Sequence, residues 1–486
     1  MIHVPLFRAS YLVAVLAVLG GLGLSAAGCS LDPSGDVHGT ALRTTVYVQP
    51  GSPPQVSAWE GDIVEAWVPG PSGYTTFSGT IDSAGQFRIA GVPPGPYWLV
   101  FTNEASTSSE TAKMFVWTQA RELDLGWQEL SPELEGETVP AGGVITGLSP
   151  AEADDHIFLT PSSGSWSASW GPRPLGAEQA TIELPGRHSV RPGVRLSAQQ
   201  IRRSQQGSLN GDTIVKYGEV VVAQGASSTP NIALTDPPAR QLGFQVDHGG
   251  FIRQLGPTPP SGVAVKRYLD FDLLASSVEN EGHSRLPSLV HLSSTVEDSQ
   301  NPDTSVIRYG DPYQPDAPRI YELRYGAYYP CTAKDKESRC GSQVYVRGPL
   351  SELAAATVRP RLSRPQALSI DGNDAMTTTE VGPSPTVRWQ VPESGQVSTY
   401  LLTLIRIVPQ PSGTPTEERA GMVITAKNEV TLLPGALKPG GRYYFKLRAF
   451  GGLAIDATVA PVRASLQNPP AESTIWSAPF TVNAVR

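Results

Sequence analysis

Short runs of alternating apolar and polar residues, separated by clusters of Gly, Pro, Ser and Asp, dominate the chain from about residue 36 onward. The segment Ile63–Val68 is one such run, and residues 78–101 contain three more with two turns between them. Alternation of this kind is typical of half-buried β-strands, and the intervening clusters are typical of turns. The pattern therefore predicts an all-β protein.

Length and composition extend this prediction to several domains. A chain of 486 residues is too long for one compact core, and 48 Gly, 45 Pro and only 17% charged residues favour short strands joined by turns. Breaks in the pattern predict tandem domains: β-sandwiches at 36–128, 129–239 and 363–486, and a further β domain at 240–362. Within the second domain, residues 196–205 have some helical propensity and predict a helical turn.

The first 28 residues have a different character. Arg8 is their only charged side chain, residues 11–24 form an apolar run, and small residues follow at 25–28. This order is that of a secretory signal peptide, and the apolar run is shorter than the roughly 20 residues of a membrane-spanning helix. We expect residues 1–28 to be removed on export.

The residues at the end of this segment carry a more specific signal. Ala26-Ala27-Gly28-Cys29 resembles the bacterial lipobox, with Ala26 where Leu or Val is commoner. The resemblance implies that Cys29 is acylated and becomes the first residue, followed by a polar tether over 29–35. Ser30, which is not Asp, implies delivery to the outer membrane under the sorting rule of enteric bacteria. Acyl chains would hold the protein on either face of that membrane.

The two remaining cysteines predict a disulfide. Cys331 and Cys340 flank a polar loop between candidate strands at 319–325 and 343–347. In an oxidising exported compartment they would pair, leaving Cys29 as the odd cysteine, and would stabilise the hairpin by roughly 2.5 kcal/mol. Their spacing, with no His nearby, does not suit a structural zinc site. No metal or cofactor is expected.

Three sequence motifs near the amino terminus resemble those of a known module. Val37-His38-Gly39, the stretch Thr80–Phe87 and the turn Pro93–Tyr97 are similar to the opening, middle and end of the carboxypeptidase regulatory-like, or transthyretin-like, β-sandwich. One residue is inserted before Asp82 relative to that pattern. The resemblance spans about 90 residues and implies a structural module without peptidase chemistry.

The carboxy-terminal segment 363–486 resembles the fibronectin type III domain. Leu437, Pro439, Tyr443 and Ala449 fall at the spacing of the pattern L-x-P-x-T-x-Y-x-x-x-V-x-A, with Gly441 and Leu447 replacing Thr and Val. The resemblance implies that Trp389 is the core tryptophan, that the Tyr443 hydroxyl fastens a corner, and that 477–482 is the last strand. No Arg-Gly-Asp sequence is present.

Candidate chemistry is sparse. The sequence contains no GxSxG, HExxH, GxxxxGK[ST] or GxGxxG motif. The acidic cluster Asp154-Asp155-His156 is interpreted as a solvated loop, and Asp371–Asp374 as a turn and not a calcium loop. Asp270 and Asp272 share a strand face and could form a glycosidase-like or calcium-binding pair, although a polar sheet face is the preferred interpretation.

Aromatic residues in polar loops are the best candidates for ligand contacts. Trp166 and Trp170 lie in a Ser/Gly-rich segment and could stack sugar rings, although packing or turn roles are commoner for such residues. Tyr325, Tyr328 and Tyr329 beside the predicted disulfide form a weaker patch of the same kind.

Charge and motifs together set the functional expectation. The net charge is −8 and no long Lys/Arg run occurs, so nothing favours nucleic-acid binding. We expect a non-catalytic envelope lipoprotein that displays β-sandwiches for adhesion, scaffolding or binding of another envelope component. A polysaccharide-binding surface lipoprotein is the alternative, and an extracellular hydrolase using Asp270 and Asp272 is a third hypothesis. Fold resemblance by itself specifies no partner.

Overall fold

The structure is a computed structural model, and its strands confirm the predicted all-β class. It describes residues 35–483 apart from 48–54, 60–61, 72, 104–111, 132–138, 141, 151, 153–154, 162–167, 171–175, 184–188, 191, 194, 207–208, 224–230, 257–262, 276–287, 296–305, 316, 332–338, 411–414 and 467. The predicted signal peptide and Cys29 lie outside these ranges. The helices within them are short: α1 (His248–Gln254), α2 (Leu350–Ala355) and α3 (Pro461–Leu466). None of them has the length and apolar character that a bilayer-crossing helix needs.

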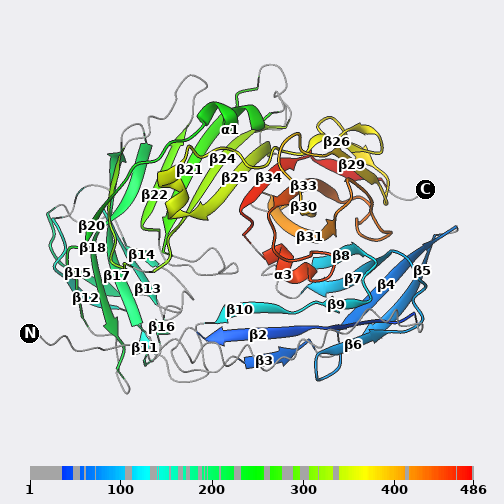
Figure 1. The fold of residues 1–486 in the computed structure, drawn as a ribbon, viewed down its shortest axis with the longest axis horizontal. Helices are drawn as coiled ribbons and strands as arrows, with labels where there is room; N and C mark the ends of the chain where they lie inside the picture. The colour runs from blue at the N-terminus through cyan, green and yellow to red at the C-terminus, as the bar shows by residue number, and fades with distance from the viewer. Residues whose placement is uncertain are drawn as a thin grey trace, which may run out of the picture.

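One sheet runs through the whole molecule (Figure 1). Its hydrogen-bonded neighbours follow one another in this order: β5 (Gly73–Thr80), β4 (Ile63–Gly70), β7 (Tyr97–Asn103), β8 (Ala112–Thr118), β31 (Thr416–Thr425), β30 (Thr399–Val408), β33 (Arg442–Gly451), β34 (Ala471–Trp476), β25 (Arg339–Pro349), β24 (Ile320–Pro330), β21 (Lys266–Leu274), β22 (Val290–Thr295), β18 (Leu209–Val221), β17 (Arg195–Gln206), β13 (His156–Pro161) and β14 (Ala168–Trp170). A further strand, β35 (Phe480–Val482), pairs with β33 and also with β28 (Glu380–Val381). The predicted sandwiches are therefore joined edge to edge by backbone hydrogen bonds.

The first sandwich covers one face of this sheet at its β5 end. Its second layer contains β1 (Val37–Thr40), β6 (Gln86–Ile89) and β9 (Glu122–Asp124), together with β2 (Leu42–Tyr47), β3 (Gln55–Ala58) and β10 (Trp127–Ser131). Alternation places Val64, Leu99 and Val116 in the core between the layers, where each is fully buried. The turn predicted at residues 82–85 is held by the Asp82 carboxylate, which accepts from two backbone N–H groups.

The last sandwich covers the opposite face. Its small sheet has the order β27 (Asn373–Asp374), β26 (Gln366–Ile370), β29 (Thr386–Gln390) and β32 (Glu429–Thr431), and it packs on β30, β31 and β33. Trp389 lies in the core with its ring 5.1 Å from that of Tyr400. The Tyr443 hydroxyl accepts a 3.0 Å hydrogen bond from the Lys438 N–H, as the resemblance implied.

The two sandwiches share their cores because they share a sheet. Parallel pairing of Lys113–Val116 in β8 with Gly421–Ile424 in β31 makes the sheets of both continuous. The face of β30 and β31 that points away from the last sandwich then enters the first core, where Leu401 and Ile424 are 3% and 2% exposed. On the other face, Phe115 of β8 enters the last core. This exchange explains why both faces of β30 are buried over residues 399–404.

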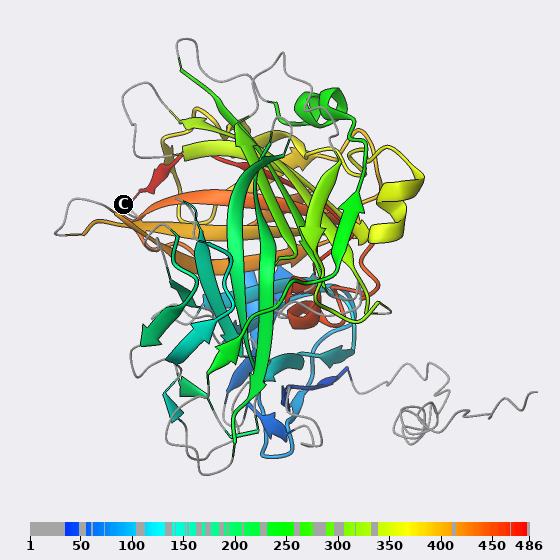
Figure 2. The ribbon, with the colours of Figure 1, turned by 90° about the vertical axis from the view of Figure 1, so that its left-hand side faces the viewer.

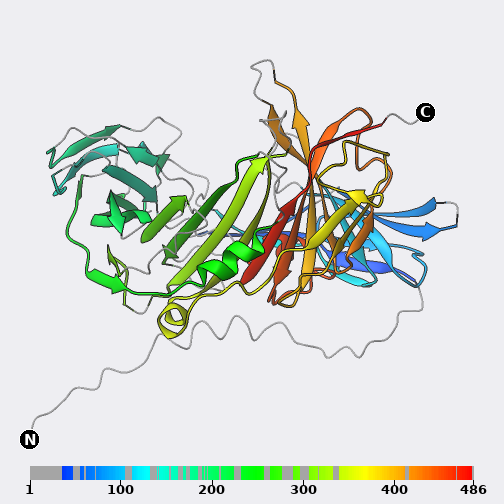
Figure 3. The ribbon, with the colours of Figure 1, turned by 90° about the horizontal axis from the view of Figure 1, so that it is seen from above.

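The middle of the chain extends the sheet and covers its other end. Figure 2 shows the long hairpin of β17 and β18. Two short strand pairs lie beside it: β11 (Val139–Pro140) with β16 (Ser189–Val190), and β20 (Ala239–Leu242) with β23 (Ile307–Gly310). A three-stranded sheet of β15 (Ala180–Glu183), β12 (Gly142–Thr146) and β19 (Ile232–Ala233) also lies there. Figure 3 shows α1 lying against the sheet of β21, β24 and β25. Phe251 of α1 stacks on Tyr325 at 4.5 Å between ring centroids.

Two local predictions were wrong. Residues 196–205 are extended in β17 and are not a helical turn, because the hairpin with β18 and the pairing with β13 supply strand partners on both sides. The last sandwich ends in two strands, β34 and β35, so its terminal strand region begins at Ala471 and not at 477. The long connection before it contains α3, whose Val462 packs into the first core.

Candidate functional site

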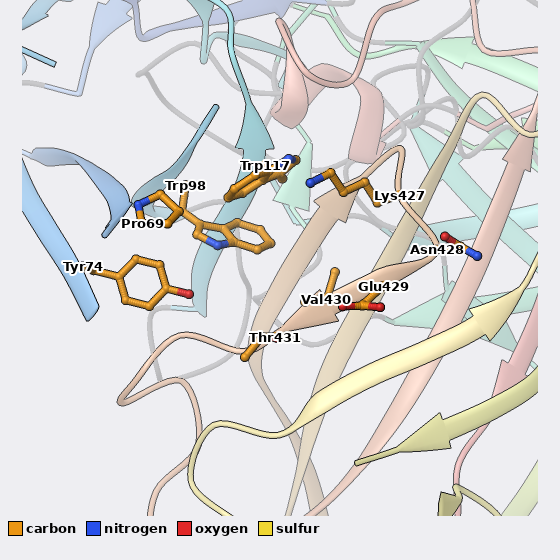
Figure 4. A pocket seen from close by; sticks show the side chains of 9 residues that line it. All are labelled: Pro69, Tyr74, Trp98, Trp117, Lys427, Asn428, Glu429, Val430 and Thr431. Carbon is orange, nitrogen blue, oxygen red and sulfur yellow. The ribbon is translucent and has the colours of Figure 1, made fainter. Parts of the chain in front are cut away.

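A cleft of about 410 Å³ lies where the first and last sandwiches meet (Figure 4). One wall comes from the first sandwich and the other from the turn between β31 and β32 and from β32 itself. The lining residues are Pro69, Tyr74, Trp98, Trp117, Lys427, Asn428, Glu429, Val430 and Thr431. The cleft therefore exists only because the shared sheet brings residues 69–117 beside residues 427–431.

A row of aromatic side chains runs along the first wall, where Tyr74, Trp98 and Trp117 line the cleft. Trp67, Trp98 and Trp117 are direct cross-strand partners on β4, β7 and β8, and the rings of Trp98 and Trp117 meet edge to face at 5.0 Å. Tyr74 on β5 completes the row, 6.2 Å from Trp67. Trp98 is buried against the last core, whereas Trp67, Tyr74 and Trp117 are partly exposed. The strand period places these rings opposite the side chains that fill the first core.

The second wall is polar and charged. The Lys427 ammonium lies 4.2 Å from the centroid of the Trp117 ring, which is a cation–π contact. The Asn428 side-chain amide donates to the Trp389 carbonyl, which fixes the turn. Glu429 forms an exposed 2.6 Å ion pair with Arg388, and this hydrogen bond lowers the pKa of the Glu429 carboxyl. Glu429 thus stays ionised and is poorly suited to act as a proton donor.

The β32 strand gives the cleft a backbone edge. In the four-stranded sheet, β32 is the terminal strand and pairs with β29 alone among the described strands. Its residues Glu429–Thr431 line the cleft. An unpaired strand edge offers N–H and C=O groups to an extended peptide, while aromatic side chains beside it offer contact area. Together they suit non-covalent binding of an extended segment.

Sequence reasoning missed this cleft. It selected Trp166 and Trp170, but Trp166 lies outside the described residues, and only the backbone of Trp170, in β14, is described. Their role in stacking stays a prediction. The available signal was the placement of Trp67, Trp98 and Trp117 on the strand face expected to be polar, which indicates a second packed or binding surface.

The carboxylates considered for hydrolysis lie together on the sheet. Asp270 and Asp272 share a face of β21, and the Asp272 carboxylate contacts His291 Nδ1 and Ser288 Oγ, each at 2.9 Å. The Asp272 hydrogen bond raises the pKa of His291, and burial raises the pKa of Asp270, which faces Arg324 on β24. Asp272 is therefore held by hydrogen bonds to its neighbours, one of which joins β21 to β22.

The other acidic clusters have structural partners. Asp155 is buried, so its predicted solvated loop is wrong at this residue: its carboxylate accepts from Gln200 at 2.7 Å and from Arg202 at 3.0 Å. Burial alone would raise the pKa of Asp155, but these hydrogen bonds lower it below its usual value. Asp154 lies outside the described residues. Asp371 lies in the turn between β26 and β27, as the turn interpretation predicts, and its carboxylate accepts from the Thr386 N–H at the start of β29. The Asp374 carboxylate accepts from the Met376 N–H within the next turn.

The predicted disulfide is present. Cys331 and Cys340 are bonded, with their Cα atoms 4.8 Å apart, and close the hairpin of β24 and β25. In the neighbouring tyrosine patch, Tyr325 and Tyr329 are buried and only Tyr328 is partly exposed. Among the described residues, no three His, Cys, Asp or Glu side chains gather closely enough to hold a metal ion.

Comparison with known proteins identifies no family and no specific function. No family model matches the chain, and no curated protein matches it. Among solved structures, the FN1–FN3 domains of chicken CNTN1 align with 12% identity over 71% of this chain and 96% of that one, at a TM-score of 0.14. A tetra-tandem repeat from the extending region of a large adhesion protein aligns with 11% identity over 90% of this chain and 99% of that one, at 0.13. These low TM-scores support no detailed comparison.

Proposed function

We propose that the protein is a non-catalytic lipoprotein of the bacterial outer membrane that binds an extended segment of another envelope protein in the junction cleft. The observation that carries the proposal is the cleft itself, in which the edge of β32 faces a row of aromatic rings. Strand edges give affinity through backbone hydrogen bonds, and partly exposed tryptophans are typical centres of binding energy.

The architecture supports a scaffold role. A sheet that is continuous from β5 to β14 resists bending between its parts more than sandwiches on flexible linkers would. In this proposal residues 36–128 are a carboxypeptidase regulatory-like module and 363–486 a fibronectin type III domain, both serving as rigid walls. Acyl chains on Cys29 supply the location, through the tether that precedes the first strand.

The anchor is tested by replacing the acylated residue. Cys29→Ser removes the thiol, so we expect the chain to appear in the soluble fraction or to keep residues 1–28 uncut. The measurement is membrane fractionation followed by mass spectrometry of the amino terminus. Membrane partitioning and processing equal to those of the natural chain would contradict lipidation.

The cleft is tested by site-directed cross-linking in intact cells. A photo-reactive amino acid at Glu429, which is half exposed beside the cleft, should join the chain to a protein segment that mass spectrometry maps to one extended stretch. Trp117→Ala in the same chain removes a partly exposed ring and should lower the yield about tenfold, the equivalent of 1.4 kcal/mol of binding energy.

The matched control is Val391→Ala, which changes a 60% exposed side chain that is not among the residues lining the cleft. It should leave the cross-linking yield unchanged. Equal yields for Trp117→Ala and the natural chain, or adducts scattered over unrelated proteins, would contradict the proposed binding site.

A further inference from the structure

A second aromatic surface lies on the sheet face opposite α1. In β21, Leu269, Phe271 and Leu273 point into the core beneath α1, so the alternate residue Tyr268 lies on the other face with the neighbouring positions of β24, β25 and β34. Tyr268, Tyr328 and Trp476 on this face are all partly exposed, and we name these three the aromatic platform.

Two rings of the platform lie over glycines. A Cβ atom on Gly326 would lie only 2.1 Å from Cζ of Tyr268, its cross-strand partner, and one on Gly341 would lie 2.9 Å from Cζ3 of Trp476. Glycine at these positions lets each ring rest against the backbone, an arrangement known to stabilise strand glycines. Rings that lie along the sheet in this way leave their outer faces directed away from it.

The third ring extends the surface across neighbouring strands. Tyr328 is 5.9 Å from Tyr268 between ring centroids, and its direct partner on β25 is Gly341, over which Trp476 lies. Since neighbouring strands are about 4.8 Å apart, the strands that carry the platform, from β21 to β34, span roughly 14 Å. The rings thus form a shallow strip on the sheet. Such a strip suits a flat sugar ring, whereas an aliphatic side chain would need a deep pocket.

A lysine side chain lies near each end of the aromatic platform. Lys266 is the direct partner of Tyr328, and Lys446 is the direct partner of Trp476, with its ammonium 5.7 Å from the ring centroid. The nearby Glu472 carboxylate is already taken by two hydrogen bonds from Arg448, of 2.8 and 2.6 Å. Neither lysine forms an ion pair with a carboxylate in the described part of the chain.

The surroundings of Lys446 favour an anion. Burial and the positive charges of Arg448, Arg324 and Arg419 lower the pKa of the Lys446 ammonium, and only Glu472 acts in the opposite direction. A bound negative charge would therefore relieve an unfavourable environment. Buried cations of this kind rarely persist without a partner.

We propose that the aromatic platform binds an acidic polysaccharide, whose sugar rings stack on Tyr268, Tyr328 and Trp476 and whose carboxylates reach Lys266 and Lys446. The C–H faces of pyranose rings pack on aromatic rings, and the two ammonium groups select a chain that carries negative charge. This site is separate from the junction cleft and extends the proposed binding function to a second class of ligand.

The experiment is affinity electrophoresis of the full soluble chain in native gels that contain alginate, an uronic-acid polymer, or neutral dextran. We expect alginate to retard the natural chain and dextran to have at least tenfold less effect. Tyr328→Ala and Lys446→Gln should each weaken retardation by alginate about tenfold, and rising salt should weaken it further because salt screens the attraction between the ammonium groups and the carboxylates of the polymer. Thermal unfolding verifies that both variants stay folded.

Trp117→Ala in the junction cleft is the matched control, and it should leave retardation by alginate unchanged. A failure of the platform is thereby distinguished from a failure of the cleft. No retardation by alginate, equal retardation by both polymers, or natural behaviour of the folded Tyr328→Ala and Lys446→Gln variants would each overturn the proposal.

Discussion

Replacement of Tyr443 by Phe isolates a single hydrogen bond in the last sandwich. Tyr443 is 1% exposed, and its hydroxyl accepts from the Lys438 N–H at 3.0 Å, which closes the corner before β33. The ring also stacks on Phe480 at 6.4 Å between centroids. Phe keeps the ring and its packing, so the variant loses only the acceptor.

The expected cost follows from the position of that hydrogen bond, which is partly buried. Loss of such a bond costs about 0.5–1.5 kcal/mol, whereas an exposed hydroxyl contributes a few tenths. Tyr444→Phe on the same strand is the matched control, because its hydroxyl donates to the exposed Glu417 carboxylate. We therefore expect Tyr443→Phe to lower the free energy of unfolding by about 0.5–1.5 kcal/mol, and Tyr444→Phe by less than about 0.5 kcal/mol.

Urea unfolding of the soluble chain, followed by tryptophan fluorescence, measures both variants. The midpoint should fall for Tyr443→Phe at an unchanged slope, since the two folded states expose the same surface. The reasoning would be refuted if the two variants lost equal stability, because the corner hydrogen bond would then contribute no more than a surface contact.

Three further changes test other parts of the structure. Leu401→Ala should cost about 2–5 kcal/mol and should speed hydrogen exchange in β7 of the first sandwich, although residue 401 belongs to the last one; unaltered exchange in β7 would contradict the shared core. The hydrogen bond with Asp272 raises the pKa of His291 above 6.5, so the stability that this contact contributes is complete below pH 6.5 and is lost as the pH rises through the raised pKa. His291→Gln should therefore flatten this part of the curve of unfolding free energy against pH. An unchanged curve would argue against the contact. Asp155→Asn should cost about 1–3 kcal/mol by weakening the contacts with Arg202, measured by thermal unfolding, and a neutral result would show that the pair is dispensable.

Local patterns in the sequence were enough to predict the all-β class and the core positions of the last sandwich. Tyr443 and Trp389 occupy the corner and core positions that the spacing of Leu, Pro, Tyr and Ala implied. Cys331 and Cys340 are paired as their flanking strands suggested. In each case the interaction joins residues whose arrangement depends on one hairpin or one sandwich, so short-range spacing carries the information.

The junction cleft could not be predicted in this way because it depends on pairing over about 300 residues. Nothing in residues 112–118 alone indicates that β8 adds to β31. The apolar run of residues 400–405, interrupted only by Thr403, was nevertheless a usable signal, since a strand buried on both faces loses its alternation. Trp67, Trp98 and Trp117 on the supposedly polar face gave the complementary signal from the first sandwich.

Amide hydrogen exchange in β8 tests the shared sheet most directly. Successive amides of a strand point to alternate sides, so those of Lys113–Val116 divide between β7 and β31 if both neighbours are present. The shared sheet predicts that every amide in this stretch exchanges slowly in the full chain, whereas β5, the terminal strand, shows slow exchange only at alternate positions. Fast exchange at alternate amides of β8, matching β5, would mean that the two sandwiches are not joined.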